Sequence, residues 1–290
     1  MEIATPTEST AILLISCPDQ KGLVVSIANF VFQNNGNIVH ADNHIDAEMG
    51  LFLMRVEWEL HGFQIAKDEI AARFAPIAEQ FKMNWSLHFS DRSRRIAIMV
   101  SKYNHCLYDL VLRNASGELP GEIALVISNH TDLEPVAKQF GIPFHFFPIN
   151  RENKREQEQK ELEILASHEI DLVVLARYMQ VLSAEFVSAM PNRIINIHHS
   201  FLPAFIGSRP YHQAYERGVK LIGATSHYVT EHLDDGPIIE QDVIGISHRD
   251  SVEDLIRKGR DLEKITLARA VLLHLKARVL LYGKKTVVFS

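Results

Sequence analysis

Three side chains that can move protons or donate hydrogen bonds lie late in the sequence. Asn196 and His198 end an apolar run of strand length, and Asp234 lies further along in a turn that feeds another apolar run. Because side chains alternate along a strand, Asn196 and His198 share one face and His199 lies on the other. An amide and an imidazole leaving one strand end can both stabilise a developing oxyanion, and a nearby carboxylate can relay protons. These residues are therefore candidates for catalysis.

The same residues also have structural interpretations. A histidine in the loop after a strand is often structural, and Asp-Asp-Gly, as in Asp234-Asp235-Gly236, is common turn chemistry. On residue types alone, the constellation is suggestive and defines no reaction.

Strands and helices alternate around these residues. The expected strands are Arg95–Val100, Ile123–Ser128, Phe144–Ile149, Leu172–Ala176 and Ile194–Ile197, and the expected helices are His105–Ala115, Leu133–Phe140, Asn153–His168, Ser183–Met190 and Val252–Val279. This alternation indicates right-handed βαβ units and a mainly parallel sheet. Ligands of such sheets bind beyond the carboxyl ends of the strands, so the residues after Ala176 and Ile197 are the ones to examine.

The first ninety residues have a different order of predicted strands and helices. Strand, helix, two paired strands, helix and strand follow one another, a βαββαβ order typical of ferredoxin-like domains, over Ala11–Ser16, Leu23–Asn34, Ile38–Ile45, Leu51–Leu60, Lys67–Phe81 and Met83–Phe89. We predict an α/β protein with a ferredoxin-like domain over residues 8–89, a linker over 90–94 and a Rossmann-like catalytic domain over 95–290.

Composition excludes several classes of function. The net charge of −6 provides no basic field that would gather nucleic acid or anionic lipid. The apolar runs are too short for a membrane span, and the first residues lack the features of a signal peptide. Cys17 and Cys106 lie far apart and indicate neither a disulfide framework nor a cysteine-rich zinc site. We expect a cytoplasmic protein with no nucleic-acid or membrane partner.

Four segments together resemble the signature of the folate-dependent formyltransferase superfamily. They are Asn196-Ile197-His198, Ser200-Phe201-Leu202-Pro203, Gly223-Ala224-Thr225-Ser226-His227 and Leu233-Asp234-Asp235-Gly236-Pro237-Ile238-Ile239, and the resemblance covers about residues 94–290. The family includes glycinamide ribonucleotide transformylase and methionyl-tRNA formyltransferase. The resemblance implies that Asn196, His198 and Asp234 are the catalytic residues.

The resemblance also implies a folate pocket. The segment Ala176–Ser183 is similar to the part of the family that lines the pteridine slot, and the loop Tyr228–Leu233 forms the facing wall. The substrate-binding residues so implied are Met179, Gln180, Val181, Leu182, Val229, Glu231 and Leu233. The folate is then the substrate, with no metal and no further cofactor.

The formyl acceptor is inferred from what the chain lacks. Tyr103 and His105 stand where the glycinamide enzyme has a glycine-rich phosphate loop, and the chain ends soon after the helix Val252–Val279, without the extra domain of the tRNA enzyme. Water remains as the acceptor. The segments Ser101–Leu107, Phe201–Gly207 and Pro210–Tyr215 resemble the hydrolytic members of the family. We expect hydrolysis of 10-formyltetrahydrofolate to formate and tetrahydrofolate, with Asn196 and His198 stabilising the oxyanion and Asp234 handling the water and the proton transfer.

The N-terminal domain resembles the ACT family through Cys17–Val24 and Asn35–Ile38. Modules of that family often pair across subunits and bind small amino acids. The resemblance implies a homodimer or homotetramer, and an amino-acid effector site lined by Asp19, Gly22, Asn37 and Ile38. A role in pairing alone remains an alternative.

Three alternative functions stay open. With fifteen histidines, the chain invites a metal-dependent deformylase, but His198 and His199 face opposite ways, and His227 and His232 lack the HExxH spacing. Formyl transfer to a small amine and a catalytically silent amino-acid sensor are the other two. Cys106 beside His105 invites a nucleophile, but we interpret it as helix packing.

Overall fold

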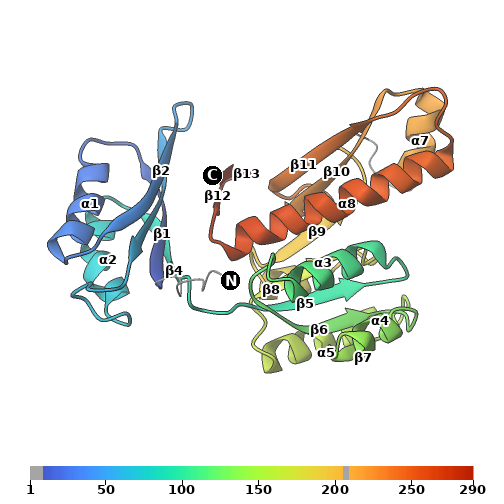
Figure 1. Cartoon of the computed structure of the whole chain (residues 1–290), viewed down its shortest axis with the longest axis horizontal. Coiled ribbons are helices and arrows are strands. Elements are labelled where there is room, and N and C mark those ends of the chain that lie inside the picture. Colours follow the sequence, from blue (N-terminus) through green and yellow to red (C-terminus); the bar gives the residue numbers. More distant parts are fainter. Residues whose placement is uncertain (1–8, 205–208, 290) are drawn as a thin grey trace, which may run out of the picture. The chain divides into compact units, whose positions relative to one another are not determined.

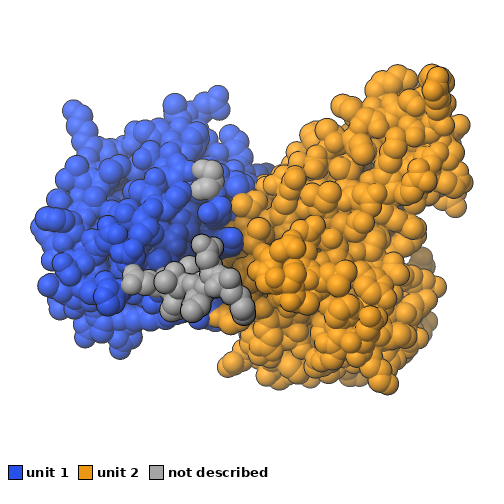
Figure 2. Space-filling model, viewed as in Figure 1, with its two compact units in different colours: residues 1–92, 276–290 blue, residues 93–275 orange. Residues whose placement is uncertain are grey.

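The computed structural model describes residues 9–204 and 209–289. The predicted boundary at residue 8 and residues 205–207 of the segment Phe201–Gly207 lie outside the described residues. The chain divides into two compact units, one formed by Met1–Arg92 with Lys276–Ser290 and the other by Ser93–Leu275 (Figure 2). The C-terminal residues, which the sequence placed in the catalytic domain, thus group with the N-terminal unit.

The N-terminal unit has the predicted βαββαβ order. Its elements are β1 (Thr10–Pro18), α1 (Leu23–Gln33), β2 (Ile38–Asp46), β3 (Leu51–Glu59), α2 (Ile70–Gln80) and β4 (Asn84–Phe89). The strands form one antiparallel sheet in the order β2-β3-β1-β4. Alternation along β1 sends Leu13 and Ile15 into the core with the helices, as expected for a sheet covered on that face. The ferredoxin-like fold is confirmed.

The opposite face of this sheet packs against the end of the chain. Ile12 and Leu14 of β1 form a small cluster with Ala277 and Phe289, which flank a hairpin of β12 (Val279–Tyr282) and β13 (Lys285–Val288). The buried Arg55 donates from Nε to the Ala277 carbonyl oxygen at 3.0 Å. A buried guanidinium needs such acceptors, so this contact helps to hold the C-terminal segment on the sheet.

The second unit is built on a seven-stranded sheet in the order β11-β10-β9-β8-β5-β6-β7 (Figure 1). Its strands are β5 (Arg95–Val100), β6 (Glu122–Ser128), β7 (Phe144–Phe146), β8 (Leu172–Leu175), β9 (Ile194–His198), β10 (Leu221–Tyr228) and β11 (Ile238–Gly245). The strands from β5 to β9 pair in parallel, whereas β10 and β11 add as antiparallel strands. The predicted mainly parallel α/β sheet is confirmed. The chain winds outward in both directions from β5, so the ends of β5 and β8 mark the switch point at which such sheets bind ligands.

Helices cover both faces of this sheet. They are α3 (His105–Ala115), α4 (Glu134–Gln139), α5 (Lys154–Ser167), α6 (Ala184–Ala189), α7 (Pro210–Arg217) and α8 (Val252–Leu275). The long α8 packs on α3, α7 and strands β9 to β11, whereas α5 and α6 pack together in the core that includes Ala97 and Met99 of β5. No helix in the described part of the chain has the length and apolar character needed to cross a membrane.

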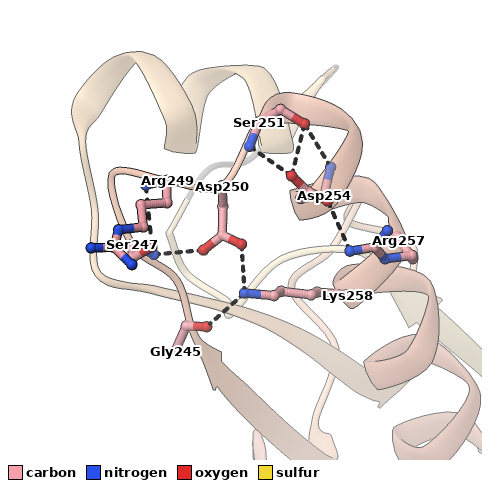
Figure 3. A network of polar contacts seen from close by, with 8 residues as sticks. All are labelled: Gly245, Ser247, Arg249, Asp250, Ser251, Asp254, Arg257 and Lys258. Atoms are coloured by element: carbon pink, nitrogen blue, oxygen red, sulfur yellow. Dashed lines mark hydrogen bonds and ion pairs between the residues drawn. The ribbon is translucent and has the colours of Figure 1, made fainter.

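Helix α8 begins at a reciprocal cap (Figure 3). The Ser251 hydroxyl accepts a hydrogen bond from the Asp254 amide at 3.2 Å, and the Asp254 carboxylate accepts one from the Ser251 amide at 3.0 Å. Lys258, one turn further on, reaches the Asp250 carboxylate at 2.8 Å. These contacts satisfy amides that the first turn leaves without partners. The helix ends at Leu275, earlier than predicted, because Ala277 takes a left-handed conformation with φ 47° and Val279 begins β12.

Candidate active site

A cavity of about 300 Å³ opens at the carboxyl ends of β8 and β9. The two strands are parallel neighbours, with Leu175 opposite Asn196, so the residues that follow each strand meet at one edge. The loop after β10 closes the other side. The cavity brings together every residue predicted for catalysis or folate binding: Asn196, His198, Asp234, Met179, Gln180, Val181, Leu182, Val229, Glu231 and Leu233.

The Asn196 side chain is held by a histidine on the neighbouring strand. Its Nδ2 lies 3.2 Å from Nε2 of His227, the residue opposite Asn196 in β10. The other ring nitrogen of His227 lies 2.9 Å from the Tyr228 carbonyl oxygen, which can only accept, so Nδ1 carries the proton and Nε2 accepts from Asn196. Burial is the main cause that lowers the pKa of His227, which keeps the ring neutral. The second N–H of the Asn196 amide remains for a ligand.

His198 and Asp234 form a buried pair. Nδ1 of His198 lies 3.2 Å from Oδ1 of Asp234, and Nε2 of His198 has no partner among the described residues. Burial raises the pKa of the Asp234 carboxyl, but the hydrogen bond from His198 and the nearby histidines outweigh it and hold that pKa below its usual value. Asp234 is therefore an ionised acceptor. It fixes the proton of His198 on Nδ1 and leaves Nε2 for chemistry.

Backbone geometry brings Asp234 into place. Asp234 adopts a left-handed conformation with φ 54°, which is uncommon outside glycine and costs free energy. Gly236, two residues on, passes so close to β10 that a Cβ there would lie 1.7 Å from the Tyr228 carbonyl oxygen and 3.1 Å from Nδ1 of His227. The Asp-Asp-Gly turn therefore needs its glycine for a close approach beside the site.

Apolar side chains form the walls next to these polar groups. Met179 and Val181 on one wall and Leu233 on the other are more than half exposed, and Leu182 is buried behind them. The Met179 amide donates to the Ser101 hydroxyl at 3.0 Å, which fixes the first wall at the end of β5. Apolar walls with a few directed polar groups suit a flat heterocycle.

A second buried cluster, which sequence reasoning missed, adjoins the cavity. The Glu263 carboxylate of α8 accepts from Nε2 of His105 at 2.7 Å and from the Tyr211 hydroxyl at 2.6 Å, and it lies 3.6 Å from Nε of Arg177. His199, which lines the cavity, packs its ring 6.0 Å from that of Tyr211. Burial and the charge of Arg177 lower the pKa of His199 to about 4. The residues come from strand ends and three helices, so no local pattern could have joined them.

One part of this cluster has the composition of a metal site. His105, Cys106 and Glu263 present ligand atoms within 4.8 Å of one another. The carboxylate already accepts two hydrogen bonds, and the cation of Arg177 lies beside it, so a divalent ion would meet like charge. Burial also raises the pKa of the Cys106 thiol well above its usual value, which opposes metal ligation and nucleophilic attack alike.

The residues predicted for an effector site do not come together within one chain. Asp19 donates its amide to Gly50 at one end of β3, whereas Asn37 lies at the other end, with its carbonyl oxygen bonded to the Glu59 amide. At ~3.3 Å per residue, the two ends of β3 (Leu51–Glu59) are separated by roughly 26 Å. Gly22, which has φ 93°, comes three residues after Asp19, and Ile38 comes directly after Asn37. The four residues thus form two distant pairs.

Comparisons with known proteins extend over nearly the whole chain. The sequence profile described as formyl transferase matches residues 94–271. The chain is 59% identical over 281 residues to a formyltetrahydrofolate deformylase of Synechocystis sp., covering 97% of this chain and 99% of that protein. It is 50% identical over 279 residues to the formyltetrahydrofolate deformylase of Bacillus subtilis, covering 96% and 93%. A crystal structure of a formyltetrahydrofolate deformylase from Pseudomonas syringae pv. tomato superposes with a TM-score of 0.96 at 46% identity, covering 99% of this chain and 96% of that one.

Proposed function

The chain belongs to the formyltetrahydrofolate deformylases of the formyl transferase family, and from this membership we propose that it hydrolyses 10-formyltetrahydrofolate to formate and tetrahydrofolate. One cavity contains Asn196, His198 and Asp234 beside apolar walls, and this observation supports assigning the reaction to these residues.

Asn196 and His198 hold the formyl oxygen. The Asn196 amide has one N–H bonded to His227 and a second available to the substrate. His198 is fixed through Nδ1, and its Nε2, which has no partner among the residues the structure describes, is the second donor when it carries a proton. Donors positioned in advance stabilise the charge that develops on this oxygen as water attacks, without reorganising at that moment.

Asp234 handles the water. Its contacts with His198 and His227 both use Oδ1, so Oδ2 is the oxygen left to accept a water proton. A carboxylate with a lowered pKa is a weak base, so Asp234 orients the water and takes its proton only as the new C–O bond forms. The C–N10 bond then breaks, its electron pair stays on N10, and the proton returns to that nitrogen.

The pteridine ring occupies the apolar slot. Met179, Gln180, Val181 and Leu182 form one wall, and Val229, Glu231 and Leu233 form the other. The proposed reaction uses the folate as its substrate and needs no further cofactor.

The N-terminal unit is proposed to regulate or assemble the enzyme as a homodimer or homotetramer. The Asp19–Gly22 pair and the Asn37–Ile38 pair lie at opposite ends of β3, so one amino-acid site containing all four requires two copies of the chain. Titrating the full-length protein with a panel of amino acids while following formate release and oligomeric state tests this. A flat response across the panel leaves pairing as the role.

The two cysteines support a reducing, cytoplasmic location. Cys17 and Cys106 are both buried free thiols. A chain that keeps its thiols unpaired suits a compartment in which glutathione maintains them. Activity recovered outside the cytoplasmic fraction of its host cell would contradict this location.

The function is tested by product analysis. Purified protein is supplied with 10-formyltetrahydrofolate, with and without small amines, and formate and formylated amine are measured. We expect formate without any amine, and a loss of roughly 10²–10³-fold in Asn196→Ala and His198→Ala. His248→Ala, which removes an exposed histidine remote from these contacts, is the matched control. Formylated amine as the main product would indicate a transferase, and no turnover at all would indicate a silent sensor.

A further inference from the structure

Arg177 is buried, and two of its nitrogens have no hydrogen-bond acceptor within the described part of the chain. The residue is 9% exposed, and neither Nε nor Nη1 has a partner among the described residues. Its backbone has φ 63°, a left-handed conformation that is uncommon outside glycine. Burying unpaired N–H groups of a cation costs free energy, and strained, unsatisfied residues concentrate at functional sites. These features indicate that the unpaired N–H groups of Arg177 bind a hydrogen-bond acceptor that comes from a ligand.

The carboxylate of Glu263 does not serve as that acceptor. Glu263 lies 3.6 Å from Nε of Arg177, beyond hydrogen-bonding distance, and its oxygens already accept from His105 and Tyr211. Burial raises the pKa of Glu263, but the hydrogen bond from His105 and the charge of Arg177 outweigh it, so the carboxylate is ionised. Glu263 therefore balances the charge of Arg177 without occupying the N–H groups.

This arrangement depends on a glycine within a helix. A Cβ at Gly259 would lie 2.1 Å from the Tyr211 hydroxyl oxygen, so only glycine lets the tyrosine cross α8 there. Glu263 follows one helical turn later on the same face and receives the hydroxyl. Glycine inside a helix lowers stability by about 1 kcal/mol relative to alanine. Here the glycine makes room for Tyr211, whose hydroxyl bonds to Glu263 beside Arg177.

Arg177 lies where the product is formed. It lies two residues after the end of β8 and lines the same cavity as Asn196 and His198, near the end of the neighbouring β9. The ring of Tyr103, which is 41% exposed, lies 5.0 Å from Cζ of the guanidinium. The tyrosine packs on the guanidinium as a cation–π partner and remains in contact with solvent.

We propose that Arg177 is the binding site of the formate ion that leaves after hydrolysis. Formate is a small planar carboxylate, and a guanidinium presents paired N–H groups that match it. Water adds to the formyl carbon, the C–N10 bond breaks, N10 receives a proton, and the resulting formic acid releases its own proton to solvent. The formate then moves from Asn196 and His198 to Arg177 before it leaves past Tyr103. This assignment rests on the proposed hydrolase function.

Formate binding can be measured without turnover. 13C-labelled sodium formate is titrated with wild-type or Arg177→Gln protein, and the broadening of its NMR line is measured. The control is Arg193→Gln, which removes an exposed arginine just before β9. Product inhibition by formate is measured on the same proteins. Loss of one charge-assisted contact weakens binding by about 10–100-fold, so we expect that loss in Arg177→Gln and wild-type behaviour in Arg193→Gln.

A paired variant protects the test against misfolding. Removing Arg177 alone leaves Glu263 as an uncompensated buried charge, so Arg177→Gln combined with Glu263→Gln is measured as well, and we expect the same loss of formate binding. Formate affinity unchanged in any folded Arg177 variant, or no saturable formate binding by the wild type, overturns the proposal.

Two further measurements separate the formate site from two alternatives. In the first alternative Arg177 binds the folate tail, and in the second it binds anions in a protein that is not a hydrolase. The carboxylates of the folate glutamate tail share the chemistry of formate. A KM that rises only for polyglutamylated substrate in Arg177→Gln, with formate affinity intact, would assign Arg177 to the tail and overturn the formate site. Wild-type protein that binds formate but releases none from 10-formyltetrahydrofolate would refute the hydrolase function and leave the anion site standing.

Discussion

Nδ2 of Asn196 donates to Nε2 of His227 across the antiparallel pair of β9 and β10, at 3.2 Å. The opposite side of the same imidazole donates to the Tyr228 carbonyl oxygen at 2.9 Å. The ring therefore has a single tautomer that suits both partners, and it sets the direction in which the Asn196 amide points. We expect His227 to act on the site through Asn196, as a positioning residue.

His227→Phe should keep the packing of the ring and remove the acceptor. An unpaired Asn196 amide can rotate, so we expect kcat to fall by about tenfold, the value of one ordinary hydrogen bond of ~1–1.5 kcal/mol, with little change in KM. Formate release and the unfolding temperature are measured together. His248→Phe, at an exposed site, is the control. A folded His227→Phe protein with the wild-type kcat would remove His227 from this role.

Gly236→Ala should disturb the site although it adds one methyl group. That methyl group would lie 1.7 Å from the Tyr228 carbonyl oxygen, the acceptor of the His227 proton. We expect a loss of stability of about 1–3 kcal/mol from overpacking, and reduced turnover as the Asp234 turn shifts. Gly245→Ala is the matched control, because an added Cβ there meets no atom of the described residues within 4 Å. Equal unfolding midpoints in denaturant for the two variants would contradict the close approach.

Val181→Asp should weaken folate binding without unfolding the protein. Val181 is 54% exposed and lines the proposed pteridine slot, so a carboxylate there is tolerated in the free enzyme but must lose water when the apolar ring binds. We expect KM for 10-formyltetrahydrofolate to rise by about tenfold or more. Leu112→Asp, at a residue 55% exposed on α3, controls for a new surface charge. If both variants keep the wild-type KM, the ring binds elsewhere.

Glu161, which bonds to Tyr178 beside the slot, should make the stability of the protein depend on pH. Burial raises the pKa of this residue to about 7, and its carboxylate accepts from the Tyr178 hydroxyl at 3.0 Å. The folded state then binds a proton that the unfolded state, with a pKa near 4.5, releases. Stability from Glu161 is therefore full below pH 4.5, falls as pH rises towards 7, and is lost above it, by on the order of 3 kcal/mol.

The matched variant for this effect is Glu161→Gln. Its neutral amide keeps an acceptor for Tyr178 and removes the titration, so the free energy of unfolding should lose this fall between pH 4.5 and 7. Denaturant unfolding over that range measures it. Glu163→Gln, at an exposed position of the same helix, should leave the slope unchanged. An identical slope in Glu161→Gln and the wild type would place the pKa of Glu161 near its ordinary value.

The sequence alone predicted the two folds, and its resemblance to the formyltransferases implied the catalytic residues and the walls of the cavity. Alternating apolar runs and helical periods are local, so they predict βαββαβ order in one part and parallel βαβ units in the other. In a parallel sheet the carboxyl ends of adjacent strands meet at one edge. The segments after Leu175 and His198 therefore had to meet wherever β8 and β9 paired, which explains why Val181 and His198 line one cavity as expected.

Tertiary structure decided which partners those residues have. His227 meets Asn196 only because β10 adds antiparallel to β9 in one register, and Glu263 meets Arg177 only because α8 packs over the sheet with Gly259 against Tyr211. Likewise the end of the chain packs on β1, and the strand β3 separates Asp19 from Asn37. Such pairings depend on strand register and on close packing between distant segments, which local periodicity does not encode.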